Sequence, residues 1–133
     1  MATTSLNNDG VNYTTGKDGI VIVRNLDSIR GGRSLDVTGF TPEVIQAGHV
    51  VIQDNASPPN FKPMPVNSGA TAYAALPASH SYAGIVIATV PTKKAMVGIL
   101  TNGTVNPNAT PYPMASILSA VQTALPQITF RAD

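Results

Sequence analysis

The sequence predicts a mainly β fold: a small β-sandwich or barrel-like domain with one short α-helix near the C-terminus and an extended N-terminal arm. Short runs of β-branched residues alternate with Gly, Pro and Asn, which is typical of strands joined by turns. Only one segment has the apolar spacing of a helix. Residues 1–19 offer almost nothing to bury and are expected to be unstructured alone. We therefore predict an arm over 1–19 and a single β-rich domain over 20–133.

The first half of the domain contains two predicted strands. Residues 20–26, IVIVRNL, form a β-branched run that predicts the first strand. Residues 27–48 are interpreted as a loop, because Gly31 and Gly32 interrupt any regular structure. Residues 49–54, HVVIQD, predict the next strand, and the paired prolines that follow it cannot donate to a β-ladder.

Further strands are predicted after a Pro-rich stretch. Residues 61–66 are expected to be extended, since Pro63 and Pro65 disfavour the helical region for the residues before them. Residues 84–90, GIVIATV, predict a strand that ends at a proline. Residues 95–106 predict a strand that runs into a tight polar turn, and its apolar residues alternate onto both faces. A strand that is apolar on both faces belongs inside a sandwich or barrel.

The helical segment lies between Pro113 and Pro126. Its apolar residues form a single stripe, which predicts a helix of about three turns; they are Met114, Ile117, Leu118, Val121 and Leu125. Alternation then returns at QITF, which predicts a closing strand.

Composition limits the partners that the chain can have. Charged residues make up 11% of the chain, whereas about 25% is usual. A surface filled instead by Asn, Ser, Thr and small apolar groups suits contact with other proteins. The net charge of +1, with interspersed signs, predicts no nucleic-acid partner. There is no secretory signal and no membrane-spanning run, so we expect no membrane partner and synthesis in the cytoplasm.

No residue pattern indicates an active site. Cysteine is absent, and His49 and His80 have no carboxylate at ligand-like spacing. We expect both histidines to be structural or solvated. The loop RGGR, residues 30–33, lacks the P-loop pattern and is interpreted as a basic loop that can touch an acidic protein surface. The sequence therefore predicts no catalytic, metal or cofactor-binding residue, no small-molecule substrate and no enzymatic activity.

The order of segments along the chain resembles a known family. IQAGHVVIQD, SHSYAGIVIATV, AMVGILTNGTVN and SAVQTALPQITF follow one another over residues 45–132. This succession is similar to that of small head decoration proteins of tailed bacteriophages, the lambda-type family, and looks like head-fibre and auxiliary capsid proteins of phages of gut bacteria. The Pro-rich segment 61–80 is longer than the lambda-type pattern requires.

The resemblance implies a structural virion protein on the outer surface of an assembled capsid. It implies a homotrimer whose partner is the major capsid protein, with the arm reaching across capsid subunits and adding a strand to a sheet edge. The residues expected to contact the capsid are Thr3, Thr4, Ser5, Leu6, Tyr13, Arg30 and Arg33. The alternative is a non-viral adhesion or fimbrial-type binding module that exposes a tyrosine to a glycan; the candidates are Tyr13, Tyr73, Tyr82 and Tyr112.

Overall fold

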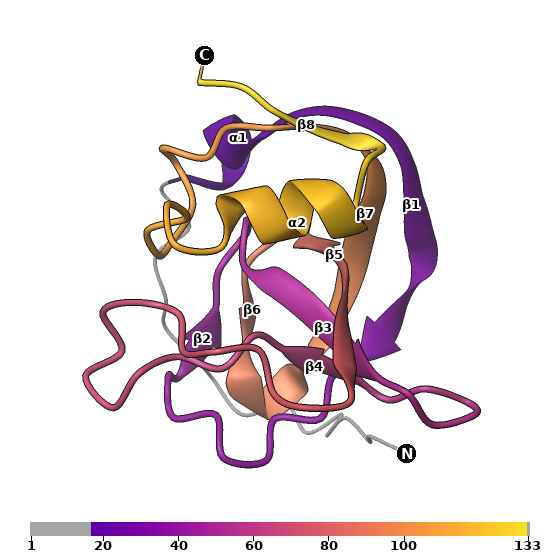
Figure 1. Cartoon of the computed structure of the whole chain (residues 1–133), viewed down its shortest axis with the longest axis vertical. Helices are drawn as coiled ribbons and strands as arrows, with labels where there is room; N and C mark the ends of the chain where they lie inside the picture. Colours follow the sequence, from indigo (N-terminus) through magenta and orange to yellow (C-terminus); the bar gives the residue numbers. More distant parts are fainter. Residues whose placement is uncertain (1–16, 133) are drawn as a thin grey trace.

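The computed structural model describes residues 17–132, and it contains a six-stranded sheet and a two-stranded sheet (Figure 1). The larger sheet has the order β1-β7-β5-β3-β4, and β8 pairs separately with β7. Its strands are β1 (Ile22–Ser34), β3 (Val50–Asp54), β4 (Phe61–Pro63), β5 (His80–Val86), β7 (Met96–Val105) and β8 (Ile128–Phe130). The smaller sheet pairs β2 (Val44–Ile45) with β6 (Val90–Pro91). The helices are α1 (Asp18–Val21), the single-turn 3₁₀ helix η1 (Thr92–Lys94) and α2 (Leu118–Ala124).

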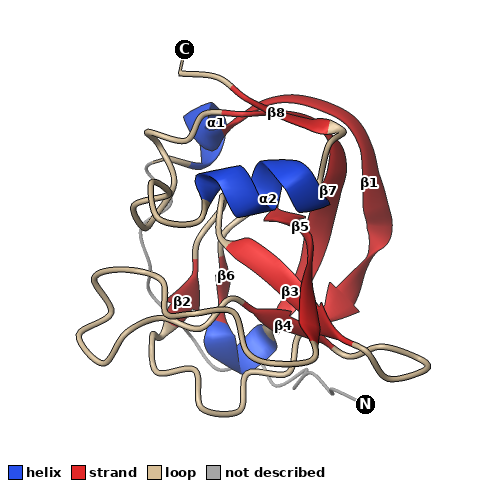
Figure 2. Cartoon of the chain, viewed as in Figure 1, coloured by secondary structure: helices blue, strands red, loops and turns tan. Residues whose placement is uncertain are grey.

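The predicted fold class is confirmed: the protein is mainly β with one short helix near the C-terminus (Figure 2). Every strand pair is antiparallel except β7 with β8. Successive residues of one strand belong to different apolar clusters, since Val50 and Ile52 pack in one cluster and Val51 in the other. The sheet is therefore buried on both faces, as the apolar alternation predicted.

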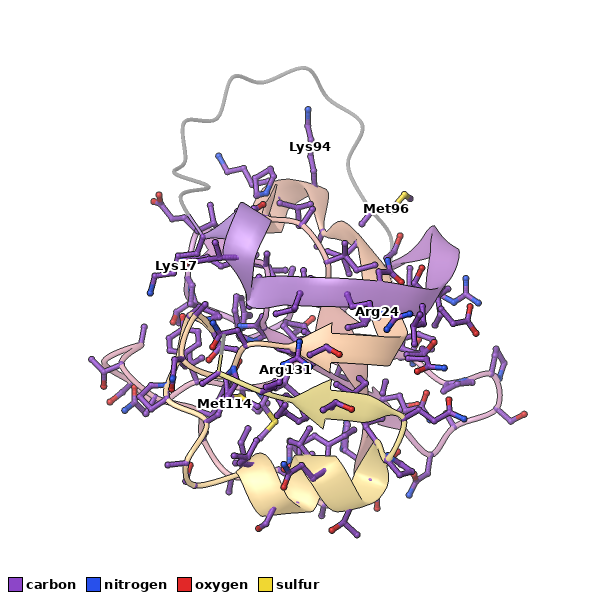
Figure 3. The ribbon with its side chains drawn as sticks, turned by 90° about the horizontal axis from the view of Figure 1, so that it is seen from above. Lys17, Arg24, Lys94, Met96, Met114 and Arg131 are labelled. Atoms are coloured by element: carbon purple, nitrogen blue, oxygen red, sulfur yellow. The ribbon has the colours of Figure 1, made fainter. Side chains whose placement is uncertain are left out.

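The larger apolar cluster lies beneath α2. Ile117 and Val121 are buried in it together with Ile85 of β5 and Ile128 of β8. The helix is shorter than predicted, because residues before Leu118 form a turn in which the carbonyl of Met114 accepts two backbone hydrogen bonds. Seen from above, β1, the end of β7 and β8 lie side by side, with α2 beyond β8 (Figure 3).

Two predictions at the edge of the sheet differ from the structure in their bounds. The strand predicted over 20–26 is the first part of β1, but it starts at Ile22 because α1 extends to Val21. The predicted loop is wrong at its start, since β1 continues through the glycine pair to Ser34 and stays paired with β7. Four register shifts and a positive φ of 73° at Gly32 accommodate this irregular pairing.

The predicted polar turn within 101–106 is also wrong. β7 continues as a strand to Val105. Residues 103–105 pair with β1 on one side and with β8 on the other. Hydrogen bonds to two neighbouring strands therefore outweigh the turn preference of the Asn-Gly pair.

The remaining strands agree with the predictions except at their ends. The strand predicted over 49–54 is β3, and the extended segment at 61–66 begins with β4. The strand predicted over 84–90 begins earlier, at His80, and ends at Val86, while Val90 belongs to β6. The closing strand is β8, with Ile128 buried and Thr129 exposed.

Candidate functional site

The expected capsid contacts divide into two groups. Those in the predicted arm lie outside the described residues; they are Thr3, Thr4, Ser5, Leu6 and Tyr13. Arg30 belongs to β1, and the structure describes its backbone but not its side chain. Arg33 is exposed, its guanidinium lies 5.7 Å from the centre of the Phe61 ring, and Nη1 donates to the carbonyl of Gly32 at 3.0 Å. Both arginines therefore belong to a strand, and the basic loop expected from RGGR is not formed.

The end of the predicted arm is attached to the folded body. The Asp18 carboxylate accepts hydrogen bonds from the backbone N–H of Thr89 at 2.9 Å and from its hydroxyl at 2.5 Å. The Thr89 hydroxyl oxygen in turn accepts from the N–H of Ala47 at 3.1 Å. These bonds place Asp18, which the sequence assigned to the arm, in contact with the domain.

Strand β1 is the most exposed strand of the larger sheet. It stands at one end of the strand order of this sheet and pairs only with β7 among the described strands. Residues 23–27 are all exposed. Two large apolar side chains of β1 project into solvent, since Val23 is 38% exposed and Leu26 is 56% exposed, and Ile20 in the preceding helix α1 is also 56% exposed. Figure 1 shows β1 arching along one side of the molecule. An edge strand carries backbone N–H and C=O groups that can pair with another chain.

A fourth exposed apolar side chain lies on β7, beside the far end of β1. Met96, at the start of β7, is 49% exposed and pairs with Ser34. Its side chain points away from the sheet (Figure 3). An apolar run predicts burial, so the sequence did not indicate that these side chains face solvent. The polar neighbours Arg24, Asn25 and Asp27 were the one available signal.

His49 lies in a buried aromatic cluster. It is 1% exposed, and its Nε2 forms a hydrogen bond with the carbonyl of Met64 at 2.9 Å. Its ring meets Phe40, Tyr73 and Tyr112 edge to face, with centroids 5.2 to 5.5 Å apart. Burial lowers the pKa of His49 to about 4, against a smaller opposing effect of the Met64 carbonyl. The neutral imidazole is thus a packing group.

The tyrosines expected to contact a glycan differ in how exposed their side chains are. Tyr13 lies outside the described residues. Tyr73 is 8% exposed, and its hydroxyl oxygen accepts a hydrogen bond from the N–H of Val50 at 3.1 Å. That side chain serves the core, so the expectation that it is exposed is corrected. Tyr82 and Tyr112 are half-buried and pack against the larger apolar cluster.

The side chains of the described residues form no metal centre. Within residues 17–132, no group of three or more His, Asp or Glu side chains is arranged to hold a metal ion. No helix in that part of the chain is long and apolar enough to cross a membrane. Comparisons with models of protein families, with curated proteins and with solved structures found no match to this chain.

Proposed function

We propose that this chain is a structural virion protein that binds the outer surface of an assembled phage capsid through the major capsid protein. The observation that supports the proposal is the exposed edge strand β1 with its solvent-facing Val23 and Leu26, together with the exposed Ile20 in the adjoining helix α1. A sheet edge can receive a strand from a partner, and backbone hydrogen bonds then supply affinity while apolar side chains add burial.

The low charge of the chain fits such a role. Charged residues make up 11% of the sequence, so long-range electrostatic steering contributes little. Attachment then depends on many short-range contacts, and an assembled shell presents them in a fixed array. The proposal includes a homotrimer. Three copies that bind the shell at the same time give a higher overall affinity than one weak contact alone.

Co-sedimentation tests the proposal. Full-length protein and a variant lacking residues 1–16 are each mixed with empty heads of the phage that encodes the chain and, separately, with unassembled capsid subunits. The deletion stops before Lys17 because the Asp18 carboxylate is bonded to Thr89. We expect the full chain to sediment with heads and to leave the subunits unbound, because separate subunits offer only part of the site.

The deletion variant provides the second measurement. It should keep its circular dichroism spectrum and melting temperature and lose attachment to heads. Equal binding of both versions, or no binding to heads, would contradict the proposal.

A non-viral adhesion module is the second candidate. The observation that favours it is a small pocket with both charged and apolar walls, formed by residues that include Phe40, Lys62 and His80. Binding of the full chain to a cell surface, together with no attachment to heads, would support this candidate.

A further inference from the structure

A pocket of about 230 Å³ lies between the loop that follows β1 and the segment that begins with β4. Its polar groups come from Asp36, Thr38, Lys62 and His80, while Phe40, Ile52 and several prolines form apolar walls. Sites for drug-sized ligands span roughly 300–1,000 Å³, so a pocket of this volume suits a single small ring.

The loop that forms one wall is held by its own hydrogen bonds. Oδ1 of Asp36 accepts from the N–H of Thr38 at 3.1 Å and from its hydroxyl at 2.7 Å. The N–H of Asp36 donates to the carbonyl of Phe61 at 2.9 Å, which attaches the loop to β4. Gly39, with a φ of 78°, allows the chain to turn back at Phe40. The wall is therefore preorganised, and Oδ2 of Asp36 has no hydrogen-bond partner among residues 17–132.

The opposite wall carries a fixed ammonium group. Nζ of Lys62 lies 3.1 Å from Nε2 of His80, and Nδ1 of His80 lies 2.7 Å from the carbonyl of Ala78. An ammonium only donates and a carbonyl only accepts, so Nε2 accepts from Lys62 and Nδ1 carries the proton. One of the three N–H bonds of Lys62 is thereby used, and the other two remain for a ligand.

The balance of charge decides between ligand classes. The side-chain and backbone hydrogen bonds from Thr38 lower the pKa of Asp36, so Asp36 and Lys62 place one negative and one positive charge in the pocket lining. The carboxylate of Asp36 therefore opposes the binding of an anion in the same pocket. A cationic ligand would be repelled by Lys62 itself. A neutral ligand that both donates and accepts hydrogen bonds satisfies Asp36 and Lys62 together.

We propose that this pocket binds one neutral sugar ring of a glycan, with one hydroxyl donating to Oδ2 of Asp36 and a neighbouring hydroxyl accepting from Nζ of Lys62. Both bonds involve a charged protein group, which makes them stronger than bonds between neutral groups. The C–H face of the ring packs against the wall that contains Phe40 and the prolines. The site does not depend on capsid attachment, and its test uses no capsid.

Amide NMR of the full-length protein tests the site. The probes are D-glucose, D-galactose, D-mannose, N-acetyl-D-glucosamine and L-fucose, each added separately, with sodium acetate as an anionic probe. At least one sugar should give saturable shifts at the amides of Thr38, Gly39 and Lys62, and acetate should give none. The absence of saturable shifts with every sugar, or saturation of these amides by acetate, would overturn the proposal.

A matched pair of variants separates the site from the fold. Asp36→Asn keeps Oδ1 for the Thr38 bonds and replaces Oδ2 by an amide nitrogen, so sugar affinity should fall about tenfold or more. Asp27→Asn is the control, because Oδ1 of Asp27 likewise accepts a backbone N–H, from Ser28, and this carboxylate lies on β1 outside the pocket. The sugar affinity of the Asp27→Asn variant should equal that of the unaltered protein. Equal affinity of the Asp36→Asn variant, with an otherwise unchanged spectrum, would overturn the proposal.

Discussion

His49 is the titratable side chain whose burial has the clearest consequence for stability. Its ring is enclosed by Phe40, Tyr73 and Tyr112, and burial keeps it neutral in the folded protein. Burial also raises the pKa of Tyr73 and Tyr112, so neither gains or loses a proton below neutral pH. His49 is therefore the group of this cluster that responds to mild acid.

We expect the free energy of unfolding to fall between pH 6.5 and pH 4. The pKa of His49 is about 4 in the folded protein and 6.5 ordinarily, so the unfolded chain binds the proton more readily within this window. The stabilisation is complete above pH 6.5 and is lost as the pH falls toward 4, at up to about 1.4 kcal/mol per pH unit and roughly 3 kcal/mol in all. Denaturant unfolding at pH 7, 6 and 5 measures the slope.

The His49→Gln variant isolates the histidine. Its amide can donate to the Met64 carbonyl but has no titration in this window, so its stability should change much less between pH 7 and pH 5. Asp36 and Asp54 do not interfere, because their pKa values lie below the ordinary 3.8. Equal stability of the unaltered protein at pH 7 and pH 5 would show that His49 is accessible to protons in the folded state.

At the level of elements, two glycines permit β7 to lie close to its neighbours. A Cβ at Gly103 would collide with the carbonyl oxygen of Arg24 in β1. A Cβ at Gly84 of β5 would collide with the carbonyl oxygen of Leu100. Backbone atoms cannot rotate out of the way as a side-chain end can, so these strands approach closely only where the side chain is hydrogen.

The Gly103→Ala variant should lose stability through β1. Relief of the collision requires β1 to move away from β7, and overpacking of this kind typically costs about 1–3 kcal/mol. The melting temperature should fall, and the amides of residues 22–26 should exchange faster with solvent. Gly19→Ala is the control, since a Cβ at this position in α1 would have nothing within 4 Å of it. A melting curve of Gly103→Ala that matches the unaltered protein would mean that β1 is not held at this crossing.

These close approaches also explain where prediction from sequence succeeded and failed. β3, β8 and the stripe of α2 were predicted because their alternation or spacing is visible locally. The glycines at 31–32 and 103 indicated breaks, whereas they serve the pairing of β1 with β7. The conformation of these residues depends on pairing between strands that are far apart in the sequence, and a local sequence pattern does not predict such pairing.

The candidate sites were less predictable than the fold. The run that contains Val23 and Leu26 is apolar, and an apolar run predicts burial, yet β1 has no further strand beyond it among the described residues. The pocket joins Asp36, Lys62 and His80, which come from three segments separated by long stretches of sequence. Only the pairing of β3 with both β4 and β5 brings Lys62 and His80 together.

At the scale of the whole molecule, the sheet is covered on both faces but not along β1. Apolar clusters pack on either side of β3, β5 and β7, so their faces are occupied within the domain. β1 lies at the end of the strand order and carries the exposed apolar side chains of Val23 and Leu26. A partner that adds a strand therefore has one long, accessible edge to use, and the proposed capsid contact can be tested at that edge alone.

The double variant Val23→Lys with Leu26→Lys should lose attachment to heads without losing the fold. Both side chains are already exposed, so the melting temperature should change little. Lysines on an edge strand oppose pairing with a further strand, and the apolar burial at the contact is lost as well.

The control Gln122→Lys with Gln127→Lys adds the same charge at two other exposed positions, one in α2 and one in the turn before β8. Co-sedimentation with empty heads should then fall sharply for the β1 variant and stay unchanged for the control. Unchanged attachment of the β1 variant would exclude this edge as the contact, whereas equal losses for both variants would show that the added charge acts without regard to position.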